Sequence, residues 1–279
     1  MPSIKVLIAE ATEQLATSSD SSRLDAEVLL CFVLGKTRSY LRAWCDNEPT
    51  DEQCAKFLKL IQQRQQGIPV AYLTGMREFW SRDFIVTPDV LIPRPDTELL
   101  IELSLQLIPE HQSFHIIDLG TGSGIIAVTL AVERPNARIT AVDTCLAALA
   151  VARHNARYYQ LTNIDFYQSY WFDHVLSTPF DLVISNPPYI AKDDEHLQQG
   201  DVRFEPKIAL VAEEQGLRDI NTIADNARRY LAPKGHLLIE HGCDQAAQVQ
   251  ALFKVLDYDK VQSYKDLSGN SRVSYGQKP

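Results

Sequence analysis

The sequence lacks several features that would each define a class of protein. No apolar run approaches the roughly 20 residues that span a membrane, and the start, MPSIKVLIAEATEQL, has no basic stretch followed by an apolar one. The five cysteines never form a C-x-x-C pair, which argues against a disulfide framework and a thiolate zinc site. An H-E-x-x-H motif is also absent. We therefore expect a soluble, cytoplasmic protein without a metal.

Basic charge is also scarce. The chain has 27 Lys and Arg against 36 Asp and Glu, a formal net charge of −9, and the acidic excess lies in its C-terminal part. Nucleic acids are gripped mainly through their phosphates, which need Lys and Arg. Direct nucleic-acid binding is therefore not expected.

The first 67 residues have apolar side chains at helical spacing, for example Leu24, Val28, Leu29, Phe32 and Val33. Breaks at 35–37 and 47–50 divide this region into four or five short helices. Ser21-Ser22 and Thr50-Asp51 are suitable helix N-caps. The pattern predicts a small helical domain over residues 1–67.

A linker is expected over residues 68–95. Its part EFWSRDFIV, residues 78–86, is rich in aromatic and β-branched residues and predicts a hairpin or an extended connector. Asp96-Thr97-Glu98 then precedes LLIELSLQLI, an acidic start to an amphipathic helix. The second domain is therefore predicted to cover residues 96–279.

This second domain alternates short apolar runs with helical segments. The seven runs are HIIDL, RITAVD, NIDFYQ, DLVISN, GHLLIE, KVQSYK and SRVSYG. Such alternation predicts an α/β fold with a largely parallel sheet covered by helices on both faces.

The first predicted strand ends in a glycine-rich turn that leads directly into a helix. The turn consists of Gly120, Thr121, Gly122, Ser123 and Gly124. Glycines let the backbone come close to a ligand at the helix N-terminus. A tight packing turn is the alternative interpretation. The spacing G-x-G-x-G differs from the dinucleotide fingerprint G-x-G-x-x-G, which favours S-adenosylmethionine over NAD.

Asp143 ends the second predicted strand, 23 residues after Gly120. A carboxylate at this edge of the sheet can accept both hydroxyl groups of a ribose. The alternative is that Asp143 is the N-cap of the helix that follows, a position that aspartate favours. Together with the upstream glycines, the pattern favours the ribose role.

Asn186-Pro187-Pro188-Tyr189 follows the fourth predicted strand. Two prolines end the strand and fix the loop, so the Asn186 side chain and the Pro187 carbonyl can act as converging acceptors for a flat NH₂ group. Tyr189 can stack on that group. A stiff turn without a ligand is the alternative, which the glycine-rich turn on the same sheet disfavours.

These motifs together resemble the class I methyltransferases that modify amide or amino nitrogens. The segments PVAYLTGMREFW, VTPDVLIPRPDTE, RFEPKIAL and DLSGNSRV further resemble the protein-(glutamine-N5) methyltransferases of peptide chain release factors, the HemK/PrmC family. The resemblance runs from about residue 68 to the C-terminus. It implies a Rossmann-like domain with a mostly parallel seven-stranded sheet, preceded by a small all-helical domain.

The resemblance also implies a reaction and roles for single residues. A methyl group would pass from S-adenosylmethionine, leaving S-adenosylhomocysteine, to the glutamine of the release factor GGQ motif. Gly120 to Gly124 would surround the methionine part of the cofactor, Asp143 the ribose and Trp171 the adenine. The segment from Asn186 to Tyr189, and above all Asn186, Pro187 and Tyr189, would hold the glutamine, and Asn186 would also border the cofactor. Tyr170 stands where the family often has Asp, which removes one acidic adenine contact.

Two other functions compete with this interpretation. A DNA adenine or cytosine amino methyltransferase acts on the same flat NH₂ group but needs a basic DNA-binding surface. An idle nucleotide-binding or adaptor protein would have lost Asn186 or the glycines, which are intact. The near-neutral helical region is expected to dock the protein substrate, and Arg94 and Glu98 are candidates for the border of the site.

Overall fold

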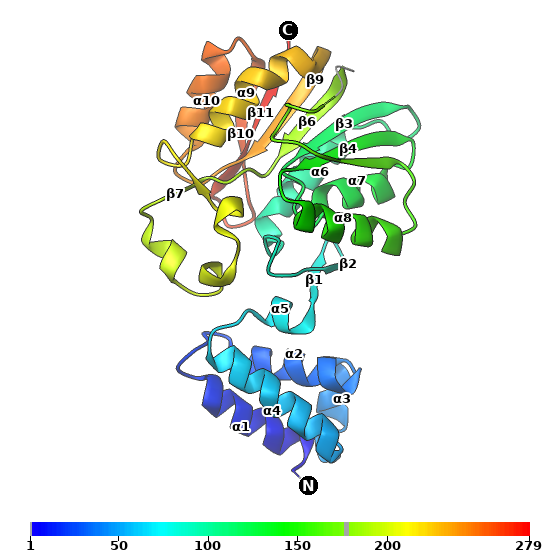
Figure 1. Ribbon diagram of the computed structural model, residues 1–279, viewed down its shortest axis with the longest axis vertical. Coiled ribbons are helices and arrows are strands. Elements are labelled where there is room, and N and C mark those ends of the chain that lie inside the picture. Colours follow the sequence, from blue (N-terminus) through cyan, green and yellow to red (C-terminus); the bar gives the residue numbers. More distant parts are fainter. Residues whose placement is uncertain (1, 176–178) are drawn as a thin grey trace. The chain divides into compact units, whose positions relative to one another are not determined.

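The computed structural model describes residues 2–175 and 179–279, and the chain divides into two compact units (Figure 1). One unit consists of Met1–Met76 with the separate segment Glu195–Phe204. The other consists of Arg77–Asp194 and Glu205–Pro279. Each unit is described by itself.

The smaller unit is a set of helices around one apolar core. They are α1 (Ile4–Leu15), α2 (Ser22–Leu34), α3 (Arg38–Ala43), α4 (Asp51–Gln65) and α5 (Val70–Thr74). Leu15, Leu29 and Phe57 are completely buried in this core, as the helical spacing predicts. Thr50 is confirmed as an N-cap, because its hydroxyl accepts a hydrogen bond from the Gln53 N–H at 3.3 Å. Ser21 precedes α2 without a capping bond.

The segment Glu195–Phe204 belongs to this unit although it lies far along the chain. It contains the short 3₁₀ helices η2 (Glu195–Gln198) and η3 (Val202–Phe204). Arg64 of α4 is buried, and its Nε donates to Asp25 Oδ2 at 2.7 Å while its Nη1 donates to Asp201 Oδ1 at 2.9 Å. These charge-assisted bonds fasten the segment to α2 and α4.

The larger unit contains the predicted seven-stranded sheet. Its strands are β3 (Phe114–Leu119), β4 (Ala137–Asp143), β5 (Ile164–Gln168), β6 (Phe180–Ser185), β9 (Leu231–Glu240), β10 (Asp259–Lys265) and β11 (Ser271–Gln277). They lie in the order β10-β11-β9-β6-β3-β4-β5. All neighbours are parallel except β11, which is antiparallel to both β9 and β10. The expectation of a mostly parallel sheet is confirmed.

Helices cover both faces of this sheet (Figure 1). Those of one core are α6 (Glu98–Leu107) and α7 (Ile125–Glu133), with α8 (Leu146–Tyr158) beside them; those of the other are α9 (Arg218–Tyr230) and α10 (Ala246–Val255). Successive residues of a strand point to opposite faces. Ile116 accordingly joins the first core and Ile117 the second, and both are completely buried.

The order of the strands determines where a ligand can bind. The chain leaves β3 toward β4 on one side, whereas β6 pairs with the other side of β3. In such sheets a crevice opens beyond the carboxyl ends of the strands where the direction of winding reverses. The glycine-rich turn follows β3, and Asn186 follows β6. Both motifs therefore lie at this crevice.

Short elements complete the larger unit. They are the two-stranded sheet of β1 (Met76–Phe79) and β2 (Arg82–Ile85), the parallel pair β7 (Ile190–Ala191) and β8 (Val211–Ala212), and the 3₁₀ helices η1 (Pro95–Thr97) and η4 (Lys207–Ala209). Within the described residues, no helix is both long enough and apolar enough to cross a membrane.

Candidate active site

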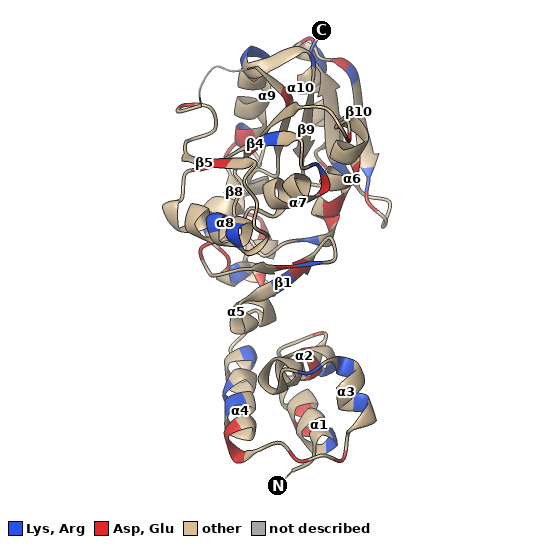
Figure 2. Cartoon of the chain, turned by 90° about the vertical axis from the view of Figure 1, so that its right-hand side faces the viewer, with Lys and Arg blue, Asp and Glu red and all other residues tan. Residues whose placement is uncertain are grey.

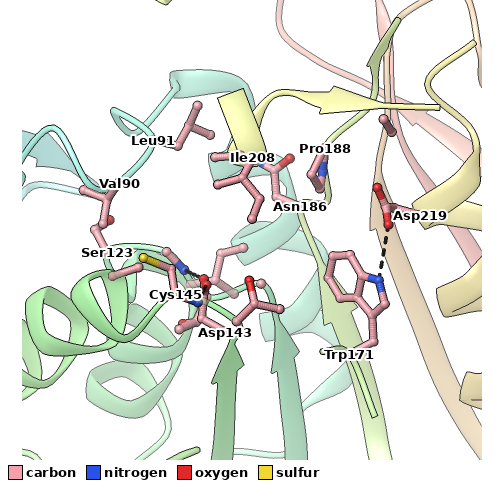
Figure 3. Close-up of a pocket in the computed structure, with 18 of the residues that line it drawn as sticks. Val90, Leu91, Ser123, Asp143, Cys145, Trp171, Asn186, Pro188, Ile208 and Asp219 are labelled. Carbon is pink, nitrogen blue, oxygen red and sulfur yellow. Dashed lines mark hydrogen bonds between the residues drawn. The ribbon is translucent and has the colours of Figure 1, made fainter. Parts of the chain in front are cut away.

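A cavity of about 430 Å³ opens at the crevice of the larger unit (Figure 3). Its lining includes all of the predicted cofactor-binding residues except Gly124, namely Gly120, Thr121, Gly122, Ser123, Asp143, Trp171 and Asn186. In Figure 3, Asp143 lies below the cavity, Asn186 and Pro188 lie above it, and Ser123 and Trp171 lie on opposite sides of it. Residues from four strand ends thus meet around one space.

The glycine-rich turn brings the backbone to the edge of this cavity. Gly122 has a φ of +56°, and a Cβ added there would meet no atom within 4 Å. Gly124 has a φ of +82°, and a Cβ added there would lie 3.0 Å from the Ala152 Cβ. The first glycine therefore keeps open space beside the turn, whereas the second allows the start of α7 to pack closely on α8.

Asp118, the one acidic residue of β3, contacts the turn from within the protein. It is completely buried, and its Oδ2 accepts a hydrogen bond from the Thr121 hydroxyl at 2.6 Å. Its Oδ1 has no hydrogen-bond partner among the described residues. Burial raises the pKa of this carboxyl to about 7, although the Thr121 bond lowers it.

Asp143 binds the backbone of the turn and also faces the cavity. Its Oδ2 accepts from the Gly122 N–H at 2.9 Å, and its Oδ1 accepts from the Cys145 N–H at 2.8 Å. Burial raises its pKa, and these backbone bonds lower it. The residue at the N-cap position of α8 is Cys145, so Asp143 does not cap that helix directly. Each carboxylate oxygen has a further lone pair for a ligand.

Trp171 forms the side wall of the cavity. Its backbone φ is +45°, a conformation that is uncommon for a bulky residue and costs free energy. A Cβ on Gly120 would lie 3.2 Å from the Trp171 ring. The indole Nε1 donates to Asp219 Oδ1 at 3.3 Å (Figure 3). The strained backbone is thus combined with a ring held against the glycine-rich turn.

The tetrapeptide after β6 contributes two residues to the cavity lining, Asn186 and Pro188. The Asn186 amide group donates from Nδ2 to Thr97 Oγ1 at 3.1 Å, which leaves its oxygen as an acceptor. Pro187 is buried. The Tyr189 hydroxyl donates to Glu240 Oε1 at 3.3 Å, and neither Pro187 nor Tyr189 is among the lining residues. A stacking role for Tyr189 stays a prediction.

Asp219 is a lining residue that the sequence analysis did not single out. It lies in the first turn of α9, and burial raises its pKa while the bond from Trp171 lowers it. Tyr170, which departs from the family pattern, places its hydroxyl 3.5 Å from the same Asp219 oxygen. No local motif marks Asp219, because it reaches the cavity only through the packing of α9.

Two further walls come from the loop between β2 and η1 and from the segment that contains η4 and β8. They are formed by Asp89, Val90, Leu91, Pro93 and Arg94, and by Ile208, Ala209, Val211, Ala212 and Glu213. Arg94 forms an ion pair with the buried Glu205, which precedes η4, and Glu205 Oε2 also accepts from the Ile92 N–H at 2.9 Å. Glu98 instead accepts from the Trp80 N–H at 2.8 Å and is not among the lining residues.

Three features together define a class I methyltransferase fold: the seven-stranded sheet with one antiparallel strand, the glycine-rich turn after its first strand and the acidic residue at the end of its second. Family comparison agrees: residues 7–75 match the PrmC N-terminal domain, and residues 96–203 match the methyltransferase small domain. A crystal structure of a methyltransferase from Pyrococcus furiosus has the same fold, with a TM-score of 0.54 and 17% identity over 79% of this chain and 97% of that chain.

Relatives with much higher identity narrow the class to one family. A release factor glutamine methyltransferase of Salmonella typhimurium is 49% identical over 267 residues, covering 96% of each chain. Another, of Shewanella oneidensis, is 48% identical over 273 residues, covering 96% of this chain and 95% of that protein. The chain belongs to the release factor glutamine methyltransferase family.

Proposed function

We propose that this protein transfers a methyl group from S-adenosylmethionine to the side-chain amide nitrogen of a glutamine in peptide chain release factors, the glutamine of the GGQ motif. One observation supports this most directly. Asn186 lines the cavity, and its Nδ2 is engaged by Thr97, so that its oxygen is the atom left to accept an N–H. The family to which the chain belongs supports the choice of substrate.

The residues around the glycine-rich turn suit S-adenosylmethionine. Gly122 leaves open space beside the backbone, where a side chain would project into the cavity. Asp143 supplies carboxylate oxygens for ribose hydroxyls, and Trp171 supplies a flat apolar wall for an adenine. When bound, the cofactor supplies an electrophilic methyl group on a sulfonium sulfur. The S–CH₃ bond would break as the N–CH₃ bond forms, which leaves S-adenosylhomocysteine, and the amide nitrogen would lose one of its two protons.

The chain's own contribution is to hold the amide nitrogen in place. An amide nitrogen is a poor nucleophile because its lone pair is delocalised. We infer that the Asn186 oxygen and the Pro187 carbonyl accept its two N–H groups, which aims the nitrogen and stabilises the positive charge that grows on it. Tyr189 and Pro188 would confine the flat amide. The proposed reaction needs no metal, and DNA is not part of the proposal.

The rival function is methylation of an amino group on DNA. A base would have to be flipped out of the duplex by a protein that also neutralises phosphates. Lys and Arg are instead scattered among Asp and Glu in both units (Figure 2), and the chain carries a net charge of −9. The observed charge favours a protein substrate over DNA. We further propose that the protein acts in the cytoplasm and that the helical unit docks the substrate.

Labelled methyl transfer tests the proposal. The full-length protein is incubated with methyl-labelled S-adenosylmethionine and, in parallel, with a purified release factor, the same factor with its GGQ glutamine replaced, and duplex DNA. We expect label only in the unaltered release factor. Label in DNA alone, or equal label in the factor that lacks this glutamine, would reject the proposed substrate.

A further inference from the structure

Three polar side chains from separate elements, those of Asn186, Thr97 and Glu240, lie in a row at one wall of the cavity. Asn186 follows β6, Thr97 ends η1, and Glu240 ends β9. The strands β6 and β9 are parallel neighbours, and Ser185 is paired with Ile239, which places Asn186 beside Glu240. Thr97 is completely buried and Glu240 is 1% exposed. These three side chains are therefore closed off from bulk water except where Asn186 and Thr97 meet the cavity.

The chemistry of these three side chains determines which of them donates a hydrogen and which accepts it. Asn186 Nδ2 lies 3.1 Å from Thr97 Oγ1. The Thr97 hydroxyl also lies near the Glu240 carboxyl, without a close hydrogen bond to its Oε2, and its proximity favours the charged form of that group. A carboxylate only accepts, and a threonine hydroxyl has a single hydrogen to donate. When that hydrogen is directed to Glu240, only lone pairs of Thr97 face Asn186, so the amide must present its NH₂ group to Thr97.

Glu240 has few other partners. Its Oε1 accepts from Tyr189 at 3.3 Å, and its Oε2 has no close hydrogen-bond partner among the described residues. Besides Tyr189, Thr97 is the side-chain donor near this carboxyl. Glu240 is not among the residues that line the cavity, so it cannot touch a ligand there. Its contacts instead reach both ends of the tetrapeptide, Asn186 through Thr97 and Tyr189 directly.

We propose that Thr97 and Glu240 are positioning residues that fix the Asn186 amide with its oxygen toward the substrate glutamine, an inference that rests on the function proposed above. A freely turning amide would present its NH₂ group to the glutamine NH₂ for part of the time. Two donors cannot hydrogen-bond each other. The buried carboxylate removes that unproductive arrangement before the substrate arrives.

Thr97→Val tests this directly, because valine has the shape of threonine without the hydroxyl. We expect the single-turnover methyl-transfer rate, with both substrates saturating, to fall about 10-fold or more, less than the roughly 10²–10³-fold scale of a directly contacting group. Thr97→Ser, which restores the hydroxyl, should recover most of the rate. Thr129→Val is the matched control, since Thr129 is completely buried, has no hydrogen-bond partner among the described residues and does not line the cavity.

A double-mutant cycle distinguishes positioning from a general structural effect. If Thr97 acts through Asn186, Thr97→Val should slow the wild type but cause no further loss in the Asn186→Ala background. A wild-type rate for Thr97→Val, or an equal loss in both backgrounds, overturns the proposal. Either result leaves the proposed function intact as long as the wild type methylates a release factor.

Glu240→Gln provides a second variant, also in case Thr97→Val does not fold. The glutamine amide can donate to Thr97, which frees the Thr97 hydroxyl to donate to the Asn186 oxygen and turns that amide around. We expect this variant to be slow as well, again with no further loss in the Asn186→Ala background. A Glu240→Gln protein with the wild-type rate contradicts the proposed role of Glu240 in orienting the Asn186 amide.

Discussion

The indole of Trp171 and the carboxylate of Asp219 form one wall of the cavity, joined by a 3.3 Å hydrogen bond from Nε1 to Oδ1. Trp171 follows β5, whereas Asp219 lies in α9 on another part of the chain. The pair places a flat apolar ring beside an acidic acceptor. That combination suits an adenine, which has a flat face and an amino group at its edge.

We therefore predict that Asp219 contributes to cofactor binding in place of the acidic residue that Tyr170 replaces. Asp219→Ala should weaken S-adenosylmethionine binding by roughly 1.5–3 kcal/mol, the scale of a hydrogen bond to a charged group. Calorimetric titration measures this. Asp225→Ala is the control, because Asp225 is an exposed residue of the same helix. Equal affinities for the wild type and Asp219→Ala would remove Asp219 from the site.

Asp143→Ala is expected to weaken cofactor binding more than Asp219→Ala does, because it removes three interactions at once. The carboxylate accepts from the Gly122 and Cys145 N–H groups, and in our proposal it also binds the ribose. Asp143→Asn keeps one oxygen for the backbone and should lose less. Titration with S-adenosylhomocysteine, together with thermal unfolding, separates the effects. Lower stability with unchanged affinity would assign Asp143 to the turn alone.

The sequence predicted the sheet well because each strand carries its own signal. Apolar runs of five or six residues, flanked by polar ones, can be recognised as strands from the local sequence alone. The glycine-rich turn and the tetrapeptide are also local, and each lies where its strand ends. Parallel strands bring their carboxyl ends to one edge, so two local motifs were enough to predict a common site.

The parts that were not predicted depend on contacts between distant residues. The segment Glu195–Phe204 packs with the helical unit through Asp201 and Arg64, and nothing in its short, polar sequence indicates that partner. Glu240 is similar. It ends an ordinary buried strand, and only the pairing of β9 with β6 brings it beside Asn186. Register between strands is set by the whole sheet and cannot be read from one segment.

Methyl transfer should rise with pH through about 7 if Glu240 must be charged to orient Asn186. Burial raises the pKa of Glu240 to about 7, and the negative charge of Asp96 in η1 also raises it. Three groups lower this pKa because they stabilise the charged form: the hydroxyls of Thr97 and Tyr189 and the cation Arg272 of β11. Single-turnover rates from pH 6 to 8 measure the profile. Asp118 titrates in the same range, so Glu240→Gln is compared with the wild type, and its profile should be flatter.

The contribution of Glu240 to stability should change in the opposite direction, over a lower but overlapping pH range. The folded-state pKa of Glu240 lies above its ordinary value of 4.5, so the folded protein binds more protons than the unfolded chain between about pH 4.5 and 7. The contribution of this group to the free energy of unfolding therefore falls as pH rises through that window. Denaturant unfolding of the wild type and Glu240→Gln gives the difference, and identical pH slopes would show that Glu240 does not titrate there.

Trp44 is predicted to contact the release factor. It is 55% exposed at the end of α3 in the helical unit, and exposed Trp side chains are enriched among the residues that dominate binding energy at protein interfaces. Trp44→Ala should raise KM for the release factor about 5- to 30-fold, corresponding to roughly 1–2 kcal/mol, and leave cofactor binding unchanged. Val255→Ala, at a 79% exposed site on α10, is the control. An unchanged KM for Trp44→Ala would place docking elsewhere.

The Asn186 side chain gives the sharpest test of the proposed mechanism. Asn186→Ala removes the acceptor that we assign to one N–H of the substrate glutamine. It should leave the fold and the cofactor affinity nearly unchanged but slow methyl transfer on the order of 10²–10³-fold, the scale for one preorganised group that stabilises developing charge. Asn186→Asp keeps an acceptor toward the cavity but presents only oxygens to Thr97. The single hydroxyl hydrogen of Thr97 could then be donated to either of two carboxylates, the new one or that of Glu240.

Asn186→Asp is therefore expected to be intermediate, and its loss should depend on Thr97. Single-turnover transfer to a release factor at saturating S-adenosylmethionine measures each rate, and titration confirms that the cofactor is still bound. Ser185→Ala is a useful comparison, because its hydroxyl donates to the Leu119 carbonyl at 2.8 Å and holds the same strand end without facing the cavity. If Asn186→Ala methylates at the wild-type rate, the two-acceptor mechanism is wrong and the tetrapeptide serves only as a rigid turn.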